Sequence, residues 1–211
     1  TRGIPDYLAE ETELRRVRRA YPGEPTAHPR LALAHVGDPA DGRTSPDLEW
    51  VSLPGEAGEP WGPDLILDYR WSPGGERIAV DTGEWTAKDR RIFVVEVADG
   101  TGRARLAYRE ADPGNETFYF WRIAWAADGA DLYLLSDRRE DYHVWALDVG
   151  MALDGDPDGE AGAGSLRQLT SGAWAVASMH PVEGGLVVVG NRDAGEERHL
   201  FRVDHGPGPE I

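Results

Sequence analysis

The sequence of 211 residues contains no cysteine. Disulfide bonds, thiol catalysis and thiolate metal sites are therefore excluded together. Basic residues are also scarce: 22 of them stand against 38 acidic ones, and Lys88 is the only lysine. The resulting net charge of −16 argues against nucleic acid or an anionic membrane surface as a partner, because the phosphates of either would be repelled.

Long apolar runs are missing too. No stretch approaches the roughly 20 residues that a membrane helix needs. The chain starts at Thr1, without an initiator methionine or a signal-type apolar stretch, and stops at Ile211 just after a strand-like run. We therefore expect it to be part of a longer protein. The lack of cysteine leaves the cellular compartment open, although we favour the cytoplasm.

A short phrase of turn and strand occurs three times. Residues 71–75 read Trp-Ser-Pro-Gly-Gly and precede an apolar run. The phrase returns 54 residues later as Trp-Ala-Ala-Asp-Gly at 125–129, and 55 residues after that as His-Pro-Val-Glu-Gly at 180–184. Gly-Gly and Asp-Gly pairs supply the positive φ of tight hairpin turns, so each phrase predicts a hairpin.

Each phrase continues in the same way, with a polar turn that contains arginine and then a second strand. The turns hold Asp89-Arg90-Arg91, Asp137-Arg138-Arg139 and Glu197-Arg198. The strands expected after them cover 92–98, 143–149 and 199–203, and the first two units add outer strands at 103–108 and 165–170. His143 and His199 each begin such a strand, which suggests a structural role for this position.

A repeat of about 40 to 55 residues with four short strands is typical of a β-propeller blade. A two-layer β-sandwich is the rival fold, but sandwiches do not normally repeat one phrase at near-constant spacing. The fold predicted is all-β, a partial propeller of about three and a half four-stranded blades. A charged and extended leading segment covers 1–29, and the blades cover about 30–60 (half a blade), 64–111, 117–171 and 172–206.

A blade cannot bury both of its faces alone, so its neighbours must cover them. An incomplete ring leaves two blade faces uncovered, each with apolar surface beyond what monomers tolerate. We therefore expect self-association through the open faces, or a chain whose missing blades belong to a longer protein.

Several phrases resemble the dipeptidyl peptidase IV group of serine peptidases. They are the Tyr-Pro-Gly-x-Pro-x-x-x-Pro-x-Leu-x-Leu phrase at 21–33, "YRWSPGGERIAV" (69–80), "LYLLSDRREDYHVWALDV" (132–149) and the stretch from "RQLTSGAW" to "RHLFRV" (167–203). The resemblance covers most of the chain from about residue 18. It implies part of an N-terminal propeller, which in that group has eight blades and lies over an α/β-hydrolase domain.

Peptidases of this group remove dipeptides from peptide N-termini, often after proline or alanine. The resemblance thus implies a peptide with a free N-terminus as the parent protein's substrate, with chemistry in a Ser-Asp-His domain. That domain is absent here: no Gly-x-Ser-x-Gly occurs, and Ser165 in "GAGSLR" does not fit the pattern. No catalytic residue is predicted in this chain.

Two sets of residues are candidates for substrate binding. Phe118, Tyr119 and Arg122 could line a peptide funnel, the arginine meeting a carbonyl group and the rings an apolar side chain, although core or rim packing is the alternative. Glu10-Glu11 invites comparison with the glutamate pair that holds the substrate amine in the family. Its place among alternating charges, directly before the Tyr-Pro phrase, favours a solvated charge run instead.

The sequence indicates no metal or cofactor. Residues 154–159 read Asp-Gly-Asp-Pro-Asp-Gly and match the opening of a calcium loop, but the twelfth position is Ser165 rather than glutamate and no flanking helix is evident. The six histidines form no metal-ligand spacing. We interpret 154–164 as an acidic, glycine-rich insertion.

The leading hypothesis is a portion of the propeller of a dipeptidyl-peptidase-IV-like serine peptidase, which restricts access and positions the peptide. The alternative is a freestanding propeller of the TolB or WD type that mediates protein–protein interaction. The Trp-Ser-Pro-Gly-Gly phrase also occurs in TolB-like repeats, so the blade motifs alone do not separate the two.

Overall fold

The computed structural model describes residues 2–6, 13–17, 28–36, 47–55, 59–112, 121–138, 141–155, 165–192 and 195–205, with only the backbone for the first two ranges. Nearly all regular structure in these ranges is β-strand, arranged in five antiparallel sheets. No helix in the described ranges is long and apolar enough to cross a membrane.

The two largest sheets are four-stranded meanders whose strands lie in sequence order. The first contains β5 (Leu65–Trp71), β6 (Arg77–Gly83), β7 (Asp89–Ala98) and β8 (Thr101–Ala111). The second contains β9 (Arg122–Trp125), β10 (Asp131–Ser136), β11 (His143–Asp148) and β12 (Leu166–Gln168). The smaller sheets pair β13 (Val176–Val182), β14 (Gly185–Gly190) and β15 (His199–Asp204), β3 (Leu31–His35) with β4 (Asp47–Val51), and β1 (Arg2–Asp6) with β2 (Glu13–Val17).

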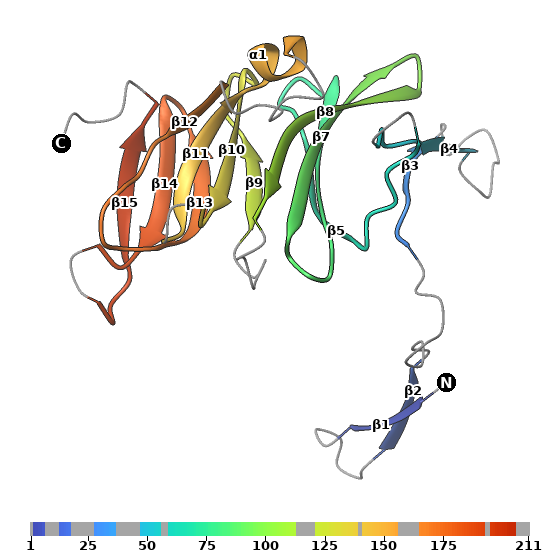
Figure 1. Cartoon of the computed structure of the whole chain (residues 1–211), viewed down its shortest axis with the longest axis horizontal. Coiled ribbons are helices and arrows are strands. Elements are labelled where there is room, and N and C mark those ends of the chain that lie inside the picture. The colour runs from blue at the N-terminus through green and yellow to red at the C-terminus, as the bar shows by residue number, and fades with distance from the viewer. Residues whose placement is uncertain are drawn as a thin grey trace.

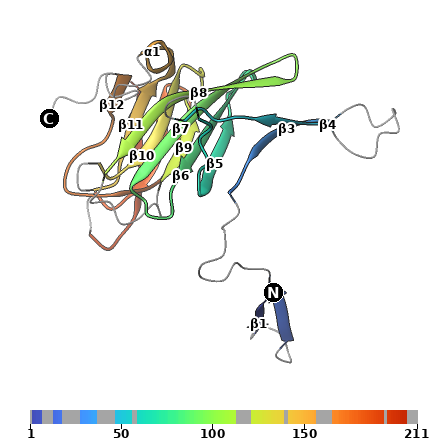
Figure 2. The ribbon, with the colours of Figure 1, turned by 45° about the vertical axis from the view of Figure 1, so that its right-hand side comes forward.

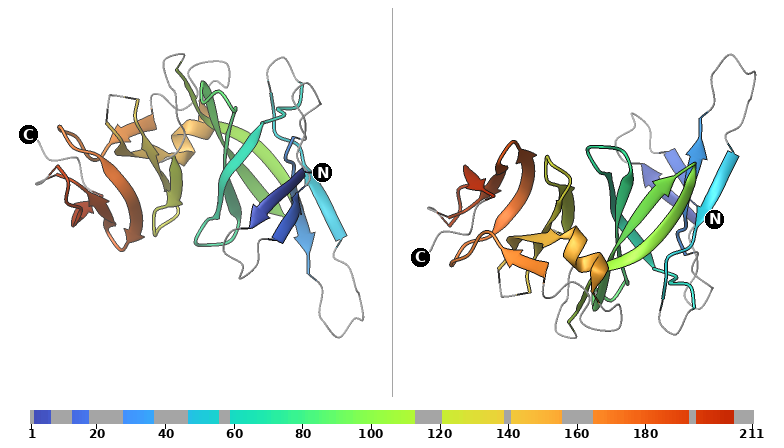
Figure 3. Two further views of the ribbon diagram at one scale, coloured as in Figure 1. Left: turned by 90° about the horizontal axis from the view of Figure 1, so that it is seen from below. Right: turned by 90° about the horizontal axis from the view of Figure 1, so that it is seen from above.

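The sheets from β3 to β15 stand side by side in sequence order (Figure 1). Views from below and above show that each sheet turns a face toward the sheet beside it (Figure 3). The β3–β4 pair lies beyond the first large sheet, and the β1–β2 hairpin lies apart from the stack (Figure 2). This arrangement of wedges, and not two sheets around one interior, is that of a partial propeller, so the predicted fold class is confirmed.

Alternation along the strands explains why the sheets stack. Leu132 and Leu134 of β10 enter the apolar cluster between the two large sheets, whereas Tyr133 and Leu135 enter the cluster against β13–β15. Side chains alternate between the two faces of a strand. A strand whose side chains are apolar on both faces therefore needs apolar cover on both sides. A third cluster joins the first large sheet to β3–β4.

The repeated phrase forms the same turn in both large sheets. The amide of Ser72 donates to the Arg77 carbonyl at 2.8 Å, and that of Ala126 donates to the Asp131 carbonyl at 2.9 Å. Gly75, Gly129 and Gly184, at the fifth position of the three phrases, have φ of 80°, 72° and 75°. Only glycine adopts this conformation readily, so the turn requires the glycine that recurs at the fifth position of the phrase.

The structure differs from the sequence-based expectation in three places. Asp89-Arg90-Arg91 was expected in a turn but begins β7, because the strand pairing with β6 and β8 extends to these residues. A short helix, α1 (Val149–Asp154), follows β11, and the Asp148 side chain caps it by accepting from the Met151 amide. Strands β1 and β2 occur within the leading segment, where none was predicted. The calcium-like stretch beyond 155 lies mostly outside the described residues.

Antiparallel connection places the loops on two rims. The glycine turns at 72–76, 126–130 and 183–184 and helix α1 lie on what we call the upper rim, which is at the top of Figure 1. The connections at 84–88 and 171–175, and residues 191–192 and 195–198 between β14 and β15, lie on the opposite, lower rim. The buried ion pair of Asp81 and Arg90 and the exposed Arg122 lie toward the lower rim.

A glycine substitution tests the packing of the third sheet. A Cβ atom added at Gly190 would lie 2.5 Å from the Trp174 ring and 2.8 Å from the Ala175 carbonyl oxygen. We expect Gly190→Ala to lower the free energy of unfolding by about 1–3 kcal/mol, measured by urea denaturation. Gly195→Ala, where an added Cβ meets nothing within 4 Å, is the control. Equal stability of the two variants would contradict this packing.

Candidate functional site

The lower rim where β9 begins is the candidate site, because it holds Arg122. Of the three residues predicted to bind substrate, Phe118 and Tyr119 lie outside the described residues. Arg122 begins β9 with its side chain exposed, and its Nη1 donates to the Trp121 carbonyl at 2.6 Å. Trp121 itself is 1% exposed, so at least one aromatic residue of this stretch packs into the interior.

A fully buried ion pair supports the start of β9. Arg90 at the beginning of β7 donates from Nε and Nη2 to the two Asp81 carboxylate oxygens, at 3.0 and 2.7 Å. Both side chains have no exposed surface. The same guanidinium crosses to the next sheet, where Nη1 donates to the Leu135 carbonyl at 2.9 Å and its carbon lies 4.8 Å from the Trp121 ring centroid. Arg90 therefore joins two blades at the lower rim.

Glu110 extends this junction. Its carboxylate accepts from the Ser136 hydroxyl at 2.7 and 2.9 Å and from the Tyr108 hydroxyl at 3.1 Å, and it lies 3.9 Å from Arg90 Nη1. Arg138 in turn donates to the Tyr108 oxygen at 3.2 Å. Burial, followed by the negative charge of Glu110, raises the pKa of Tyr108 well above its usual value, so the phenol stays protonated.

Electrostatics link this junction to the exposed Arg122. Burial raises the pKa of the Asp81 carboxyl, as does the neighbouring charge of Asp68, while Arg90 and then Arg122 oppose the rise. Asp68 on β5 also forms an ion pair with Arg70 at 3.0 Å. The site thus presents a guanidinium beside buried carboxylates. A guanidinium can bind a carbonyl or carboxylate group of a ligand.

Ser136 and His143, on neighbouring strands of the second large sheet, are each bonded to another side chain. Ser136 Oγ bonds Glu110 and not a histidine. His143, on the next strand, bonds Thr170 and Gly172. The described residues also contain no group of three or more carboxylate or imidazole side chains that could hold a metal ion. What the rim presents is a set of charged and hydrogen-bonding groups.

A second polar cluster lies on the same rim of the first large sheet. The Asp89 carboxylate accepts from Arg91 at 3.1 and 2.9 Å and from Arg109 at 3.3 and 2.8 Å. The Arg91 guanidinium carbon lies 3.7 Å from the Trp61 ring centroid. Burial acts to raise the pKa of Asp89, but the hydrogen bonds from the two arginines outweigh it and lower that pKa.

The "LTSGAW" phrase closes the second large sheet against the third. The Thr170 hydroxyl oxygen accepts from the Val144 amide at 2.9 Å and lies 3.2 Å from His143 Nδ1. His143 Nε2 donates to the Gly172 carbonyl at 3.1 Å, and its ring meets the Trp174 ring edge to face. His143 thus has the structural role expected of it. His199, at the equivalent position, has its Nε2 atom 3.4 Å from a Glu197 carboxylate oxygen.

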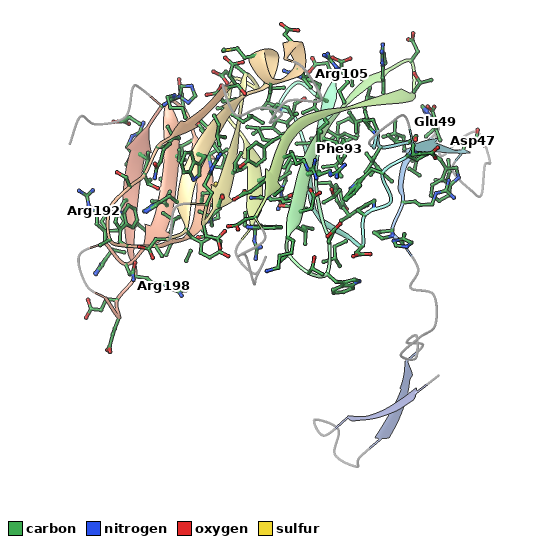
Figure 4. The ribbon with its side chains drawn as sticks, in the orientation of Figure 1. Asp47, Glu49, Phe93, Arg105, Arg192 and Arg198 are labelled. Carbon is green, nitrogen blue, oxygen red and sulfur yellow. The ribbon has the colours of Figure 1, made fainter. Side chains whose placement is uncertain are left out.

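Two cavities lie between the second large sheet and β13–β15. One of about 180 Å³ is on the lower rim and is lined by Tyr142, the start of β13 and the 191–198 connection. Arg192 and Arg198 of that connection project at the lower end of the stack (Figure 4). The other, of about 300 Å³, is on the upper rim beside Tyr133 and His205, whose side chains hydrogen-bond at 2.8 Å.

Sequence reasoning missed the buried pair of Asp81 and Arg90. Asp81 interrupts the apolar run of β6, and a charged residue inside a buried strand is a signal for a buried partner. Arg90 was placed in a turn because arginine is usually exposed. Its role depends on the next sheet, which the local sequence does not reveal.

Comparison with known proteins agrees with this architecture. The family model described as "Dipeptidyl peptidase IV (DPP IV) N-terminal region" matches residues 2–210. The chain belongs to this family. The predicted resemblance to dipeptidyl peptidase IV is thereby confirmed. No curated protein sequence matches the chain.

The solved structures similar to this member of the dipeptidyl peptidase IV N-terminal region family include the two that follow. TolB from Acinetobacter baumannii has a TM-score of 0.47 and 15% identity, with 85% of this chain and 40% of that one covered. Porphyromonas gingivalis dipeptidyl peptidase 4 has a TM-score of 0.49 and 14% identity, with 85% of this chain and 26% of that one covered. The chain therefore spans less than half the length of either protein.

The buried ion pair gives a double-mutant test. Arg90→Leu leaves the Asp81 carboxylate buried without its partner, so we expect it to cost about 3–5 kcal/mol of unfolding free energy. Adding Asp81→Leu removes the stranded charge and should recover much of that loss. Urea denaturation of both single variants and the double variant measures the coupling. Additive losses would contradict the pairing, and Arg202→Ala at an exposed arginine of β15 is the control.

The pH dependence of stability tests the His143 contacts. Burial lowers the pKa of His143 below its usual 6.5. The unfolded chain therefore binds a proton at higher pH than the folded one, so this histidine's contribution is complete above about pH 6.5 and falls as the pH drops below it. Thermal melts between pH 8 and 5 should show a smaller decline for His143→Gln than for the wild type. His180→Gln, at an exposed histidine, is the matched control.

Proposed function

We propose that this chain is a portion of the N-terminal propeller of a dipeptidyl-peptidase-IV-like serine peptidase and that it restricts access and positions peptide substrates. Membership of the family over residues 2–210 is the observation that carries the proposal. In this proposal, peptide-bond hydrolysis is carried out by a hydrolase domain that this chain does not contain, because the sequence has no Gly-x-Ser-x-Gly.

The lower rim is the proposed face for the peptide. It combines the exposed Arg122 guanidinium with a rigid, buried support. Arg90 forms this support by binding the backbone of the neighbouring sheet and the Asp81 carboxylate. A carbonyl group of an extended peptide could accept from Arg122. Because this support is buried and hydrogen-bonded, the backbone that carries Arg122 would already be ordered before a peptide binds. Prior ordering reduces the entropic cost of recognition. Phe118 and Tyr119, just before β9, remain candidates for contact with an apolar side chain.

A freestanding propeller that mediates protein–protein interaction is the second candidate. The repeated turn favours it as much as the peptidase propeller, because the turn stabilises blades of either kind. The two candidates differ in what the gene encodes beyond Ile211. A downstream Gly-x-Ser-x-Gly region is expected for the peptidase, and a stop codon directly after Ile211 would favour the freestanding propeller.

Activity assays provide the direct test. We expect the 211-residue chain to release no chromophore from Ala-Pro or Gly-Pro chromogenic substrates, while the longer polypeptide encoded by the gene cleaves them. Turnover by the short chain that persists through repurification would contradict the proposal. So would a longer polypeptide that folds, contains a complete catalytic triad and leaves these substrates intact.

Arg122 gives a residue-level test in the longer polypeptide. If its guanidinium binds substrate before the chemical step, Arg122→Ala should raise KM about tenfold with little change in kcat, the loss of one charge-assisted hydrogen bond. Arg202→Ala, on an exposed arginine near the opposite rim, is the matched control. A fall in kcat with unchanged KM would contradict a positioning role.

A further inference from the structure

An arginine bridges the glycine turns of the first and second large sheets on the upper rim. Arg77, the first residue of β6, donates from Nη2 to the Gly129 carbonyl in the turn of the second sheet at 2.8 Å. Its guanidinium carbon lies 5.1 Å from the Trp125 ring centroid. The two turns also touch, since a Cβ atom added at Gly129 would lie 3.5 Å from Pro73 Cδ. A guanidinium group therefore occupies the junction between these two turns.

At the next junction on this rim, an aspartate takes the place of the arginine. Asp131 begins β10 as Arg77 begins β6. The turns make the two positions equivalent, because the Asp131 carbonyl accepts from the Ala126 amide as the Arg77 carbonyl accepts from the Ser72 amide. The Asp131 carboxylate reaches the third sheet, where it lies 3.2 Å from His205 Nε2. A negative side chain thus stands where the first junction has a positive one.

A cavity of about 300 Å³ separates the turns at this second junction, and we call it the upper-rim cavity. Among the described residues, a Cβ atom added at Gly184 would meet only Arg202 Nη2, at 3.7 Å, so the contact between turns that is present at Gly129 is missing here. Small-molecule sites begin at about this volume. The cavity is lined by the small residues Ala127 and Val182, the acidic residues Asp128 and Glu183, and the hydrogen-bonded pair of Tyr133 and His205.

The upper-rim cavity has an acidic residue on each side. Asp128 belongs to one turn and Glu183 to the other. Asp128 Oδ1 accepts from the Ala130 amide at 3.0 Å, so its own turn holds this carboxylate in place. The neighbouring Arg202 donates to the Glu183 backbone carbonyl at 3.1 Å and to the Asp204 carboxylate at 3.0 Å. This arginine therefore neutralises Asp204 and leaves the charges of the two cavity carboxylates in place.

The titration of the lining residues reflects this negative charge. Burial raises the pKa of Tyr133, and the charges of Asp131 and Asp128 add to the effect. The phenol therefore stays protonated and forms its 2.8 Å hydrogen bond with His205 Nδ1. Burial also raises the pKa of Asp131, where His205 opposes the rise and Asp128 adds to it. A cation in the cavity would offset this accumulation of negative charge.

We propose that the upper-rim cavity binds a guanidinium group carried on a short aliphatic stem. The carboxylates of Asp128 and Glu183 accept from the guanidinium, whose planar set of donors suits carboxylate oxygens, and the stem packs against Ala127 and Val182. Arg77 is the precedent within the chain, because its guanidinium occupies the equivalent junction between the first two turns. The cavity lies on the rim opposite the proposed peptide face, so the inference does not rest on the proposed peptidase function.

Calorimetric titration of the 211-residue chain tests the site. The probe is the acetylated and amidated peptide Gly-Arg-Gly, and its control is the same peptide with citrulline, which has nearly the same shape but no charge. We expect the citrulline peptide to bind at least about tenfold more weakly, because it forms no charge-assisted hydrogen bonds. Butylguanidine separates two sources of the ligand. If the peptide binds more tightly, the ligand is an arginine side chain of a partner, and if butylguanidine does, it is a free guanidino compound.

Variants of the lining locate the binding. Glu183→Gln and Asp128→Asn keep the shape of the cavity and remove one charge each, and each should weaken binding of the arginine peptide about tenfold at an ionic strength of about 0.15 M. Glu197→Gln, at a residue whose side chain is 74% exposed on the lower rim, is the matched control and should leave binding unchanged. Ala127→Trp fills the cavity while both carboxylates remain, and it should abolish binding.

Several outcomes would overturn the proposal. Equal binding of the arginine and citrulline peptides would show that charge is not recognised. Equal weakening by Glu183→Gln and Glu197→Gln would show attraction to the net charge of −16 instead of a site. Unchanged binding to a folded Ala127→Trp variant, or no binding of either guanidinium probe at millimolar concentration, would likewise contradict it. Circular dichroism shows whether each variant is folded.

Discussion

The central sheets of this protein are apolar on both faces, and this constraint determines the rest of the structure. In β10, alternate side chains enter two different clusters, and β6 behaves in the same way with Ala79 on one side and Val80 on the other. Burying apolar surface is worth roughly 25 cal/mol per Å². A sheet with only one covered face would forfeit about half of that gain, so each sheet depends on its neighbours.

Stacking of this kind creates two rims with unequal chemistry. The upper rim of the large sheets is built from tight glycine turns, whose backbone hydrogen bonds are satisfied locally. The fully buried ion pair of Asp81 and Arg90 lies toward the lower rim, as does the pair of Asp89 and Arg91 in the same sheet. A buried ion pair contributes little net stability, but it requires one arrangement of its partners. The junction therefore fixes how neighbouring blades meet around the start of β9.

The family and the fold were predictable from the sequence because both depend on local, repeated chemistry. The Trp-turn phrase needs a positive φ at its fifth position, and glycine stands there in all three copies. The Thr170 hydroxyl and the Trp174 ring explain why "LTSGAW" is a specific motif, since Thr170 bonds β11 within the second large sheet and Trp174 packs in the cluster between that sheet and the third. The burial of Arg90 was not predictable, because its partners Asp81 and Leu135 come from another strand and another sheet.

The sequence by itself determined the strands of the repeated units, their glycine turns and the need for cover on both faces, since these properties follow from side-chain alternation and from glycine at the turns. Only the tertiary structure decided which charges become buried partners and which apolar rings stay exposed. Trp71 and Trp125 illustrate the reason: they share one local sequence pattern, but the exposure of each ring depends on the sheet that precedes it.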